Sequence, residues 1–267
     1  MKLDLVKKFI NNTLFPYMEK KKGNRIREHL NELNSHMELS KDEILDLQRE
    51  KLKKLMLYSI EHVPYYKKYA QLEDEIKRDP FKAIESFAVL KKSDLIENED
   101  SLISDEVKKE NLILNHTGGS TGKPTKFYMD RKTVEHYEAA RYRGLEQFGV
   151  GIGSRSVMIW GNTKDMTEKH QFIHDMKERF LKNRIVIPIH ALEKSKVKSY
   201  VKKINSYKPE YIYGYSGGVH QFAKLIKDAD CEIMCKIKAV VVTSEAILDE
   251  QIDFIESVFK APVVREY

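Results

Sequence analysis

The stretch NLILNHTGGSTGKPT, residues 111–125, decides how the rest of the chain is interpreted. Its first half has the apolar composition of a strand, and its second half packs three glycines, several hydroxyls and a lysine into a few residues. Glycines let backbone N–H groups turn toward an anion and approach it closely. Serine and threonine hydroxyls donate hydrogen bonds, and a lysine supplies a positive charge. The stretch therefore predicts a strand that leads into a loop for binding a polyphosphate.

The spacing of this loop separates it from two common phosphate-binding patterns. A Walker loop has four residues between its first glycine and the Gly-Lys pair, and serine or threonine follows the lysine. Here three residues separate Gly118 from Gly122, and Pro124 follows Lys123. The loop also lacks the spaced glycines of dinucleotide-binding folds. A glycine-rich hairpin turn is the simpler alternative for the same residues.

Beyond residue 111 the chain alternates short apolar runs with amphipathic helical stretches. This alternation is typical of layered α/β structure. The runs are SVMIW (156–160), RIVIPIH (184–190), YIYGYS (211–216), KAVVVTS (238–244) and APVVREY (261–267).

The first hundred residues have a different pattern. Apolar residues recur at helical spacing over residues 30–69, which predicts helix, and Pro64 is expected to end or bend it. Ser93, in the run KKSDLIE, is expected to cap a short later helix. We therefore predict a mainly helical region over residues 1–100 and an α/β nucleotide-binding portion over residues 101–267.

The composition describes a globular chain with room for a buried core. The chain has 267 residues, 41% hydrophobic and 33% charged, and its formal charge of +6 is spread along the sequence, which argues against nucleic acid as a partner. Charges interrupt the N-terminal run MKLDLVKKFI, and no later run reaches about 18 apolar residues. We therefore expect no signal peptide, no transmembrane segment and a cytoplasmic location. The only cysteines, Cys231 and Cys235, fit structural roles in a reducing compartment.

Residues 117–124, TGGSTGKP, resemble the signature phosphate loop of the adenylate-forming superfamily, which includes acyl-CoA synthetases, luciferases and the adenylation domains of peptide synthetases. The closer similarity is to the branch of phenylacetate–CoA ligases and the CapK proteins of capsular polysaccharide loci. It rests also on VPYYKK (63–68), FAVLKKSDL (87–95) and Asp130, and it runs from about residue 52 to the last residue.

The resemblance implies two-step chemistry. A carboxylate attacks the α-phosphate of ATP, and the acyl-adenylate then passes its acyl group to a thiol, usually that of coenzyme A. The loop would hold the β- and γ-phosphates together with Mg²⁺ and stabilise the charge on departing pyrophosphate, with Ser120, Thr121 and Lys123 as the main contacts. The predicted ATP-binding residues of the loop are Thr117, Gly118, Gly119, Ser120, Thr121, Gly122 and Lys123.

The same resemblance assigns two further segments to the nucleotide. Ser244, Glu245 and Ala246 follow a predicted strand, at the edge where open α/β sheets bind ligands, and the matching family segment lines the adenine pocket. A helix N-cap at Thr243 or Ser244 explains these polar residues as well. Tyr267 matches the first residue of the family's Tyr-Gly-x-x-Glu motif, whose tyrosine stacks on adenine and whose glutamate helps bind Mg²⁺.

Two other predicted strand ends are assigned to the acyl substrate. Trp160 with Gly161, and Tyr215 with Ser216, match family segments near the acyl pocket. Aromatic and small residues suit the wall of such a pocket. Trp160, the only tryptophan of the chain, would equally suit a plain core position.

Two other motifs in the sequence suggest different chemistries. Residues 214–218 match the G-x-S-x-G elbow of α/β hydrolases around Ser216. Those hydrolases place an acid and then a histidine on later loops, whereas the only later histidine here, His220, is one helical turn away, which argues against an esterase. His170 and His174 have the i, i+4 spacing of zinc ligands, but a glutamine stands in place of the catalytic glutamate, so we predict no metal site there.

We therefore expect the N-terminal part of an ATP-dependent, AMP-forming carboxylate ligase. The run that ends at Tyr267 has no turn or polar tail behind it, so we expect the domain to be interrupted there, with the hinge and catalytic lysine of the family beyond it. Such a chain is expected to be inactive by itself. The alternative is a non-catalytic binding or scaffolding remnant in a polysaccharide operon. The sequence does not give the acyl substrate or the oligomeric state.

Overall fold

The structure is a computed structural model that describes residues 2–117, 125–161 and 168–266. The contacts of the chain divide it into two compact units, Met1–Asn24 with Arg141–Tyr267, and Arg25–Ala140. We call the first the sheet unit and the second the hairpin unit, and each is described by itself. The predicted division near residue 100 stays a prediction.

The sheet unit has the layered α/β structure that the apolar runs predicted, and its sheet is parallel. Its described strands lie in the order β4-β3-β5-β6-β7, and every neighbouring pair is parallel. β6 is buried along its whole length, as expected for a central strand covered on both faces. The strands are β3 (Ser156–Trp160), β4 (Arg184–Pro188), β5 (Tyr211–Tyr215), β6 (Ala239–Thr243) and β7 (Val263–Arg265).

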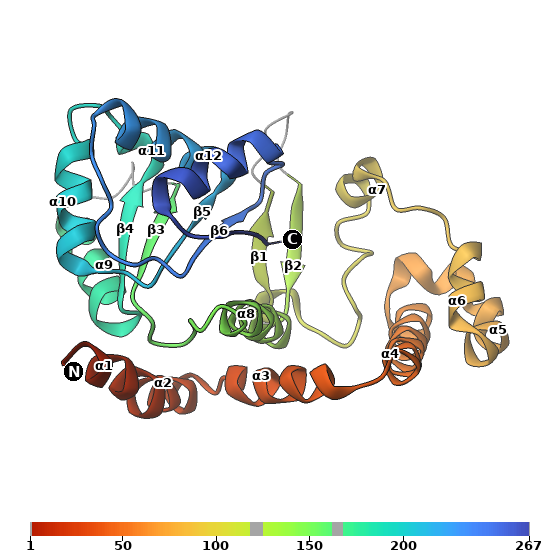
Figure 1. Cartoon of the computed structure of the whole chain (residues 1–267). Coiled ribbons are helices and arrows are strands. Elements are labelled where there is room, and N and C mark those ends of the chain that lie inside the picture. The colour runs from red at the N-terminus through yellow and green to blue at the C-terminus, as the bar shows by residue number, and fades with distance from the viewer. Residues whose placement is uncertain (1, 118–124, 162–167, 267) are drawn as a thin grey trace. The chain divides into compact units, whose positions relative to one another are not determined.

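Helices cover both faces of this sheet (Figure 1). Alternate strand residues point to opposite faces, so Val157 and Ile159 join the large core with α10, α11 and α12. Met158 and Trp160 point to the other face, where a smaller cluster includes Leu145 of α8. The helices of this unit are α1 (Lys2–Phe9), α2 (Phe15–Lys22), α9 (Glu168–Leu181), α10 (Val197–Tyr207), α11 (Ser216–Asp228) and α12 (Asp249–Phe259), with a π-helical turn η1 (Ile10–Leu14) and a 3-10 turn η6 (Ile189–Ala191).

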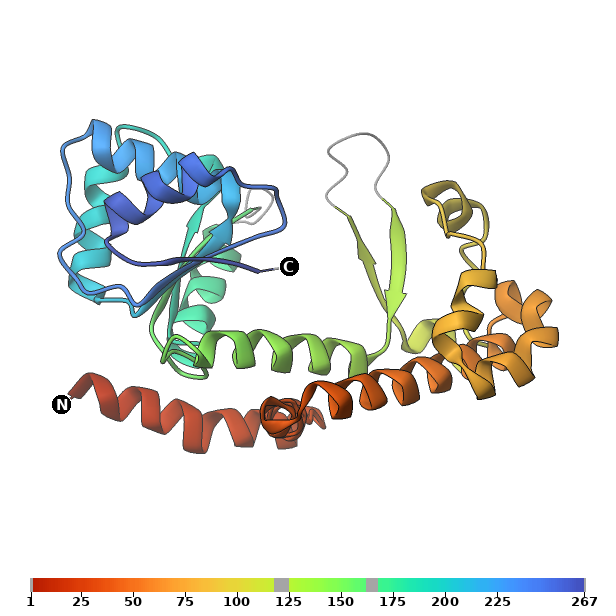
Figure 2. The same cartoon turned by 45° about the vertical axis from the view of Figure 1, so that its right-hand side comes forward.

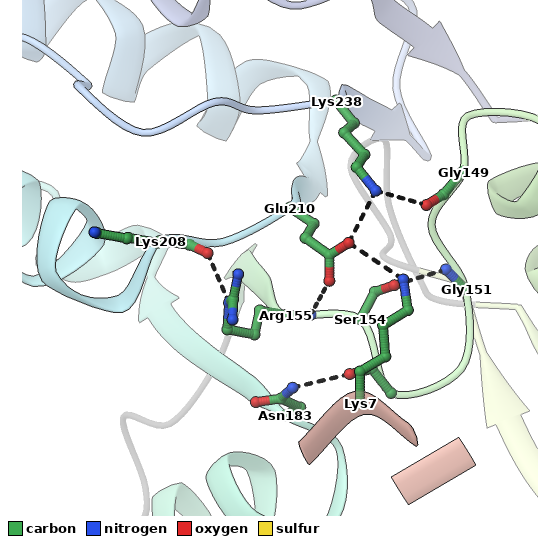
Figure 3. Close-up of polar contacts among 10 residues, drawn as sticks. Lys7, Gly149, Gly151, Ser154, Arg155, Asn183, Lys208, Glu210 and Lys238 are labelled. Carbon is green, nitrogen blue, oxygen red and sulfur yellow. Dashed lines mark hydrogen bonds and ion pairs between the residues drawn. The ribbon is translucent and has the colours of Figure 1, made fainter. Parts of the chain in front are cut away.

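Helix α1 is held to the amino end of the sheet by a half-buried carboxylate (Figure 3). Glu210, just before β5, forms ion pairs with Lys7 of α1 at 3.2 Å and with Lys238 at 3.0 Å. It also accepts the backbone N–H of Arg155 at 3.3 Å. Gly153 lets the helix approach closely, since a Cβ there would lie 2.8 Å from the carbonyl oxygen of Lys7. Residues far apart in the sequence are thus tied together at one corner of the unit.

The hairpin unit contains most of the helical region that the sequence predicted, followed by a β-hairpin (Figure 2). Met56 and Ile60 of α4 pack with Ile76 and Ala83 in a small core. Its elements are α3 (Ile26–Ser35), η2 (His36–Glu38), α4 (Lys41–His62), η3 (Pro64–Leu72), α5 (Glu73–Arg78), α6 (Pro80–Ala83), η4 (Ile84–Ser86), α7 (Lys92–Glu97), η5 (Lys109–Asn111), β1 (Ile113–His116), β2 (Lys126–Met129) and the first part of α8 (Arg131–Glu146).

Two details of the helical prediction were wrong. The helix expected over residues 30–69 is interrupted after α3, and α4 begins afresh behind the capping residue Ser40. Pro64 ends α4 as predicted, because the helix stops at His62 and a 3-10 segment follows. Ser93 does not cap α7 but lies inside it, since the helix begins at Lys92. Among the described residues, no helix is both long and apolar enough to cross a bilayer.

Candidate functional site

The predicted phosphate loop connects the two strands of the hairpin. β1 and β2 pair antiparallel, and the last pair of the ladder is His116 opposite Lys126. Beyond it, the Thr117 N–H donates to the Thr125 carbonyl at 3.0 Å, and the Thr125 N–H donates to the Thr117 hydroxyl at 3.1 Å. Thr117 therefore closes the base of the loop. The other predicted loop residues, Gly118, Gly119, Ser120, Thr121, Gly122 and Lys123, lie outside the described residues.

The strand order defines where a ligand is expected on the sheet unit. From β3 the chain crosses to β4 on one side, and it then continues with β5, β6 and β7 on the other side. β3 and β5 are therefore neighbours at the point where the order reverses. Ligands of open α/β sheets bind outside the carboxyl ends of the strands at such a switch point.

Trp160 and Tyr215 meet at this switch point. Each ends its strand, and their rings stack with centroids 4.1 Å apart and planes 15° apart. Both side chains are half-buried, and Trp160 packs against the smaller cluster that includes Leu145, so its core role and its substrate role both stay predictions. Gly161 follows Trp160 beside the same ring, and a Cβ there would lie in ordinary contact with Tyr215, at 3.7 Å. The predicted substrate residues of β3 and β5 are thus brought together.

The turn after β6 joins the same edge through its backbone. Ser244 has a left-handed backbone with φ of 68°, and Ser244, Glu245 and Ala246 are exposed. The Ser216 hydroxyl donates to the Glu245 carbonyl at 2.9 Å, and the Gly217 N–H donates to the Glu245 carboxylate at 2.7 Å. Glu245 therefore accepts hydrogen bonds from two donors in the first turn of α11, and these bonds hold the turn after β6 against the end of β5.

The N-cap reading of Thr243 and Ser244 was wrong. Helix α12 begins at Asp249, several residues later, and the residue at its N-cap is Leu248. The Leu248 N–H donates to the Gln251 side chain at 3.0 Å, which satisfies one exposed donor of the helix start. Thr243 and Ser244 thus do not cap α12. The adenine-binding role of Ser244, Glu245 and Ala246 stays a prediction.

Sequence reasoning missed two residues beside the aromatic pair. The Tyr213 hydroxyl hydrogen-bonds the Glu266 carboxylate, and the Trp160 ring also lies near Tyr213, with centroids 5.8 Å apart. The alternation YIYGY carried the signal, because residues two apart on a strand share a face. Trp160 therefore stacks with both Tyr213 and Tyr215 on the face opposite the large core. Tyr267, the predicted adenine contact, lies outside the described residues.

The ionisable groups at this edge have environments that suit binding rather than hydrolysis. Burial, and then the nearby Glu245 carboxylate, raise the pKa of Tyr215, so its hydroxyl stays a proton donor at neutral pH. Ser216 is 2% exposed, and its hydroxyl contacts backbone carbonyls. His220 instead lies 3.2 Å from the Gln251 amide, and burial followed by Lys224 lowers its pKa. Ser216 thus differs from an exposed nucleophile paired with a base.

The remaining candidates have structural surroundings. His170 and His174 both lie on α9, and His174 forms a 3.5 Å ion pair with Asp175. Cys231 and Cys235 are half-buried free thiols that pack against the large core. Over residues 2–117, 125–161 and 168–266, no three histidine, cysteine, aspartate or glutamate side chains are grouped so as to hold a metal ion.

Solved structures share the fold of this chain. The open conformation of 2-hydroxyisobutyryl-CoA ligase, bound to 2-HIB-AMP and CoA, has a TM-score of 0.59 and 18% identity, over 81% of this chain and 51% of the ligase. The same enzyme in its thioesterification state has a TM-score of 0.59 and 20% identity, over 85% of this chain and 49% of that one. The helical N-terminal region and parallel α/β sheet are thus the fold of acyl-CoA ligases of the adenylate-forming superfamily.

A curated protein is similar in sequence over most of the chain. Protein CapK of Staphylococcus aureus is 26% identical over 227 residues, which cover 85% of this chain and 50% of CapK. No model of a protein family matches the chain. The chain is therefore a CapK homologue with the adenylate-forming fold, as the phosphate loop predicted. It spans about half the length of the relatives that it matches.

Proposed function

We propose that the chain is part of an ATP-dependent, AMP-forming ligase that activates a carboxylate. The observation that carries this proposal is the Trp160–Tyr215 stack at the switch point of the sheet, where a ligand is expected. The similarity to CapK and the fold of an acyl-CoA ligase support it. A role in capsular polysaccharide biosynthesis and a cytoplasmic location, where ATP and coenzyme A are abundant, belong to the same proposal.

The nucleotide is assigned to two segments. The loop of residues 117–123 binds the β- and γ-phosphates, with Lys123 as the point charge on departing pyrophosphate. Mg²⁺ is the usual companion of such phosphates, and the loop hydroxyls are the hard oxygen ligands that it prefers. Ser244, Glu245 and Ala246, with Tyr267, form the adenine wall. The exposed Ser244 turn supports this, because it presents backbone and side-chain polar groups beside the aromatic pair.

The substrate is assigned to the edge formed by Trp160, Gly161, Tyr215 and Ser216. Flat aromatic surface with one phenolic donor suits an acyl group whose carboxylate must be oriented. In the reaction, a carboxylate oxygen attacks the α-phosphorus and the bond to pyrophosphate breaks, which leaves an acyl-adenylate. A thiol then attacks the acyl carbon and AMP leaves. Coenzyme A is the proposed thiol, since 2-hydroxyisobutyryl-CoA ligase was solved with CoA.

The proposal is tested by binding, with Trp160 as the reporter. Because Trp160 is the only tryptophan and lies at the proposed acyl wall, a stable acyl-adenylate mimic should change its fluorescence. Lys123→Ala should weaken binding of ATP with Mg²⁺ about tenfold or more, because one charge-assisted contact is lost. Lys126→Ala, an exposed lysine of the same hairpin, is the matched control and should bind like the parent. Equal loss in both variants would contradict the loop assignment.

The isolated chain is proposed to be inactive in the first half-reaction. The reason is that it spans about half the length of the relatives that it matches. Carboxylate-dependent ATP–pyrophosphate exchange by the purified chain would contradict this part of the proposal. The second candidate function is that of a non-catalytic binding or scaffolding protein. Lys123→Ala in the cell separates the two functions. A scaffold tolerates the change, whereas a chain that works in a ligase does not.

A further inference from the structure

The β-hairpin that carries the predicted phosphate loop has few buried side chains. β1 and β2 form a sheet of two strands (Figure 1). The side chains of Ile113, Leu114 and Phe127 are exposed, and the half-buried side chains of β2 are those of Tyr128 and Met129. A two-stranded hairpin by itself is marginally stable in water, and strands without a buried face specify their register weakly. The geometry of this hairpin therefore depends on contacts outside its ladder.

Glu99 connects the two strands of the hairpin from outside the ladder. The Tyr128 hydroxyl, on β2, donates to the Glu99 carboxylate at 2.8 Å. The Lys109 ammonium donates to the same carboxylate at 3.4 Å, and it lies 4.7 Å from the centroid of the Tyr128 ring. Lys109 also pairs with Asp100 at 2.6 Å. Because Lys109 begins the 3-10 turn η5 that leads into β1, the cluster contacts β2 and the segment before β1.

The hydrogen bond between Tyr128 and Glu99 is charge-assisted. This bond outweighs partial burial and, with the contacts of Lys109, lowers the pKa of Glu99. The carboxylate is therefore charged at neutral pH, and a hydrogen bond to a charged acceptor is about twice as strong as one between neutral groups. One such contact can hold the register of a hairpin that has few buried side chains.

The contact with Glu99 selects one register of the hairpin. In the observed ladder, Tyr128 lies opposite Leu114. Successive side chains of a strand point to opposite faces, so a slip of one residue would turn the Tyr128 hydroxyl away from Glu99. The same slip would break the bonds at the loop base, where the Thr117 N–H donates to the Thr125 carbonyl at 3.0 Å and the Thr125 N–H donates to the Thr117 hydroxyl at 3.1 Å. The register that satisfies Glu99 is therefore the one that closes the loop base.

We propose that Glu99 is a positioning residue for nucleotide binding, because it fixes the register in which Thr117 closes the loop base. Glu99 acts through the hairpin and not by contact with the nucleotide. This role rests on the proposed function in one respect, the assignment of Thr117 to ATP. The register itself is a property of the free chain, so it can be measured without a ligand.

The first test is amide exchange at the loop base in the free chain. Glu99→Ala and Tyr128→Phe should each speed exchange of the Thr117 N–H about fivefold, because each variant loses the hydrogen bond that holds the register. The double variant should exchange no faster than either single variant, since both changes remove the same contact. Glu99→Gln should exchange nearly like the parent, because its amide oxygen still accepts from the Tyr128 hydroxyl. Circular dichroism confirms that each variant is folded.

The second test is binding of ATP with Mg²⁺ to the full chain. Glu99→Ala should weaken binding about threefold, because apparent affinity falls with the fraction of the chain in the competent register, and Glu99→Gln should restore it. Two matched controls should exchange and bind like the parent. They are Tyr137→Phe, an exposed tyrosine of α8, and Glu110→Ala, an exposed neighbour of Lys109 in η5.

Three results would overturn the role of Glu99. They are unchanged Thr117 exchange in both single variants, a Glu99→Gln chain that exchanges as fast as Glu99→Ala, and a Glu99→Ala chain that binds ATP like a parent that binds it well. A parent chain that does not bind ATP with Mg²⁺ contradicts the proposed function instead. The exchange measurement still decides whether Glu99 sets the register of the hairpin.

Discussion

At the scale of single residues, the packing of β5 against β3 depends on Gly214. A Cβ at this position would lie 2.5 Å from the Ile159 carbonyl oxygen and 3.0 Å from a Val219 methyl group. Neither the Ile159 backbone nor the buried Val219 side chain can move away without disturbing the sheet or the core. Gly214→Ala should therefore lower the free energy of unfolding by about 3 kcal/mol, the upper range for overpacking. Urea unfolding followed by Trp160 fluorescence measures the loss within the sheet unit.

Gly144 provides the matched control for that prediction. It lies inside α8, and a Cβ there would meet nothing within 4 Å. Alanine is the better helix former by about 1 kcal/mol, so Gly144→Ala should leave stability unchanged or raise it. If both alanine variants lost the same stability, the close approach of Gly214 to Ile159 would not be the cause.

The individual site residues were predictable, but their pairing was not. Trp160 and Tyr215 could each be placed at the end of an apolar run, because such runs predict strands. That their rings stack depends on β3 lying next to β5, and the sequence does not carry that order. Ser93 was misplaced for a local reason: the Asp94 carboxylate accepts the Lys91 N–H at 2.7 Å, so the helix start moved ahead of the serine.

At the scale of elements, the start of α4 is set by a capping box. The Glu43 N–H donates to the Ser40 hydroxyl at 3.3 Å, and the Ser40 N–H donates to the Glu43 carboxylate at 2.8 Å. Ser40→Ala should therefore destabilise the hairpin unit by about 1 kcal/mol, and it should speed amide exchange in the first turn of α4. Ser59→Ala, inside the same helix, is the control, because the Ser59 hydroxyl donates only to the Leu55 carbonyl. No change in exchange at the start of α4 would contradict the role of Ser40.

The pattern SKDE at residues 40–43 could have predicted that boundary, since serine followed three residues later by glutamate marks a helix start. The long helical periodicity on both sides concealed it. For α9 the difficulty was of another kind. The spacing of His170 and His174 suited a helix, but spacing does not say which side of the helix faces the sheet, where Glu178 pairs with Arg184.

At the scale of the whole molecule, the predicted site residues are divided between the two units. Thr117, at the base of the phosphate loop, belongs to the hairpin unit, whereas Trp160, Tyr215 and the Ser244 turn belong to the sheet unit. The resemblance predicted one ATP site from both segments, and that assembly stays a prediction. The layered α/β fold itself followed from the alternation of apolar runs with helices, because that pattern constrains architecture more strongly than it constrains side-chain contacts.

The attachment of the N-terminal helix to the sheet unit should make stability depend on pH through Glu210. Burial by itself would raise the pKa of Glu210, but the hydrogen bond from Lys238 and the charge of Lys7 outweigh burial and lower it (Figure 3). The unfolded pKa of a glutamate is about 4.3, so this carboxylate stabilises the fold fully above that pH. The stabilisation is lost as the pH falls through the lower pKa of the folded state.

Glu210→Gln should therefore cost about 2 kcal/mol at pH 7, because two lysines lose a charged partner. The gap between the free energies of unfolding of wild type and variant should shrink as the pH falls below about 4, because the wild-type carboxylate is then protonated and neutral like the glutamine amide. Urea unfolding across this pH range, followed by Trp160 fluorescence, measures the gap. Glu250→Gln, at an exposed position of α12, should show almost no gap at any pH. A gap for Glu210→Gln that stayed constant down to pH 3 would mean that the lost stability comes from packing and not from the charge that links α1 to the sheet.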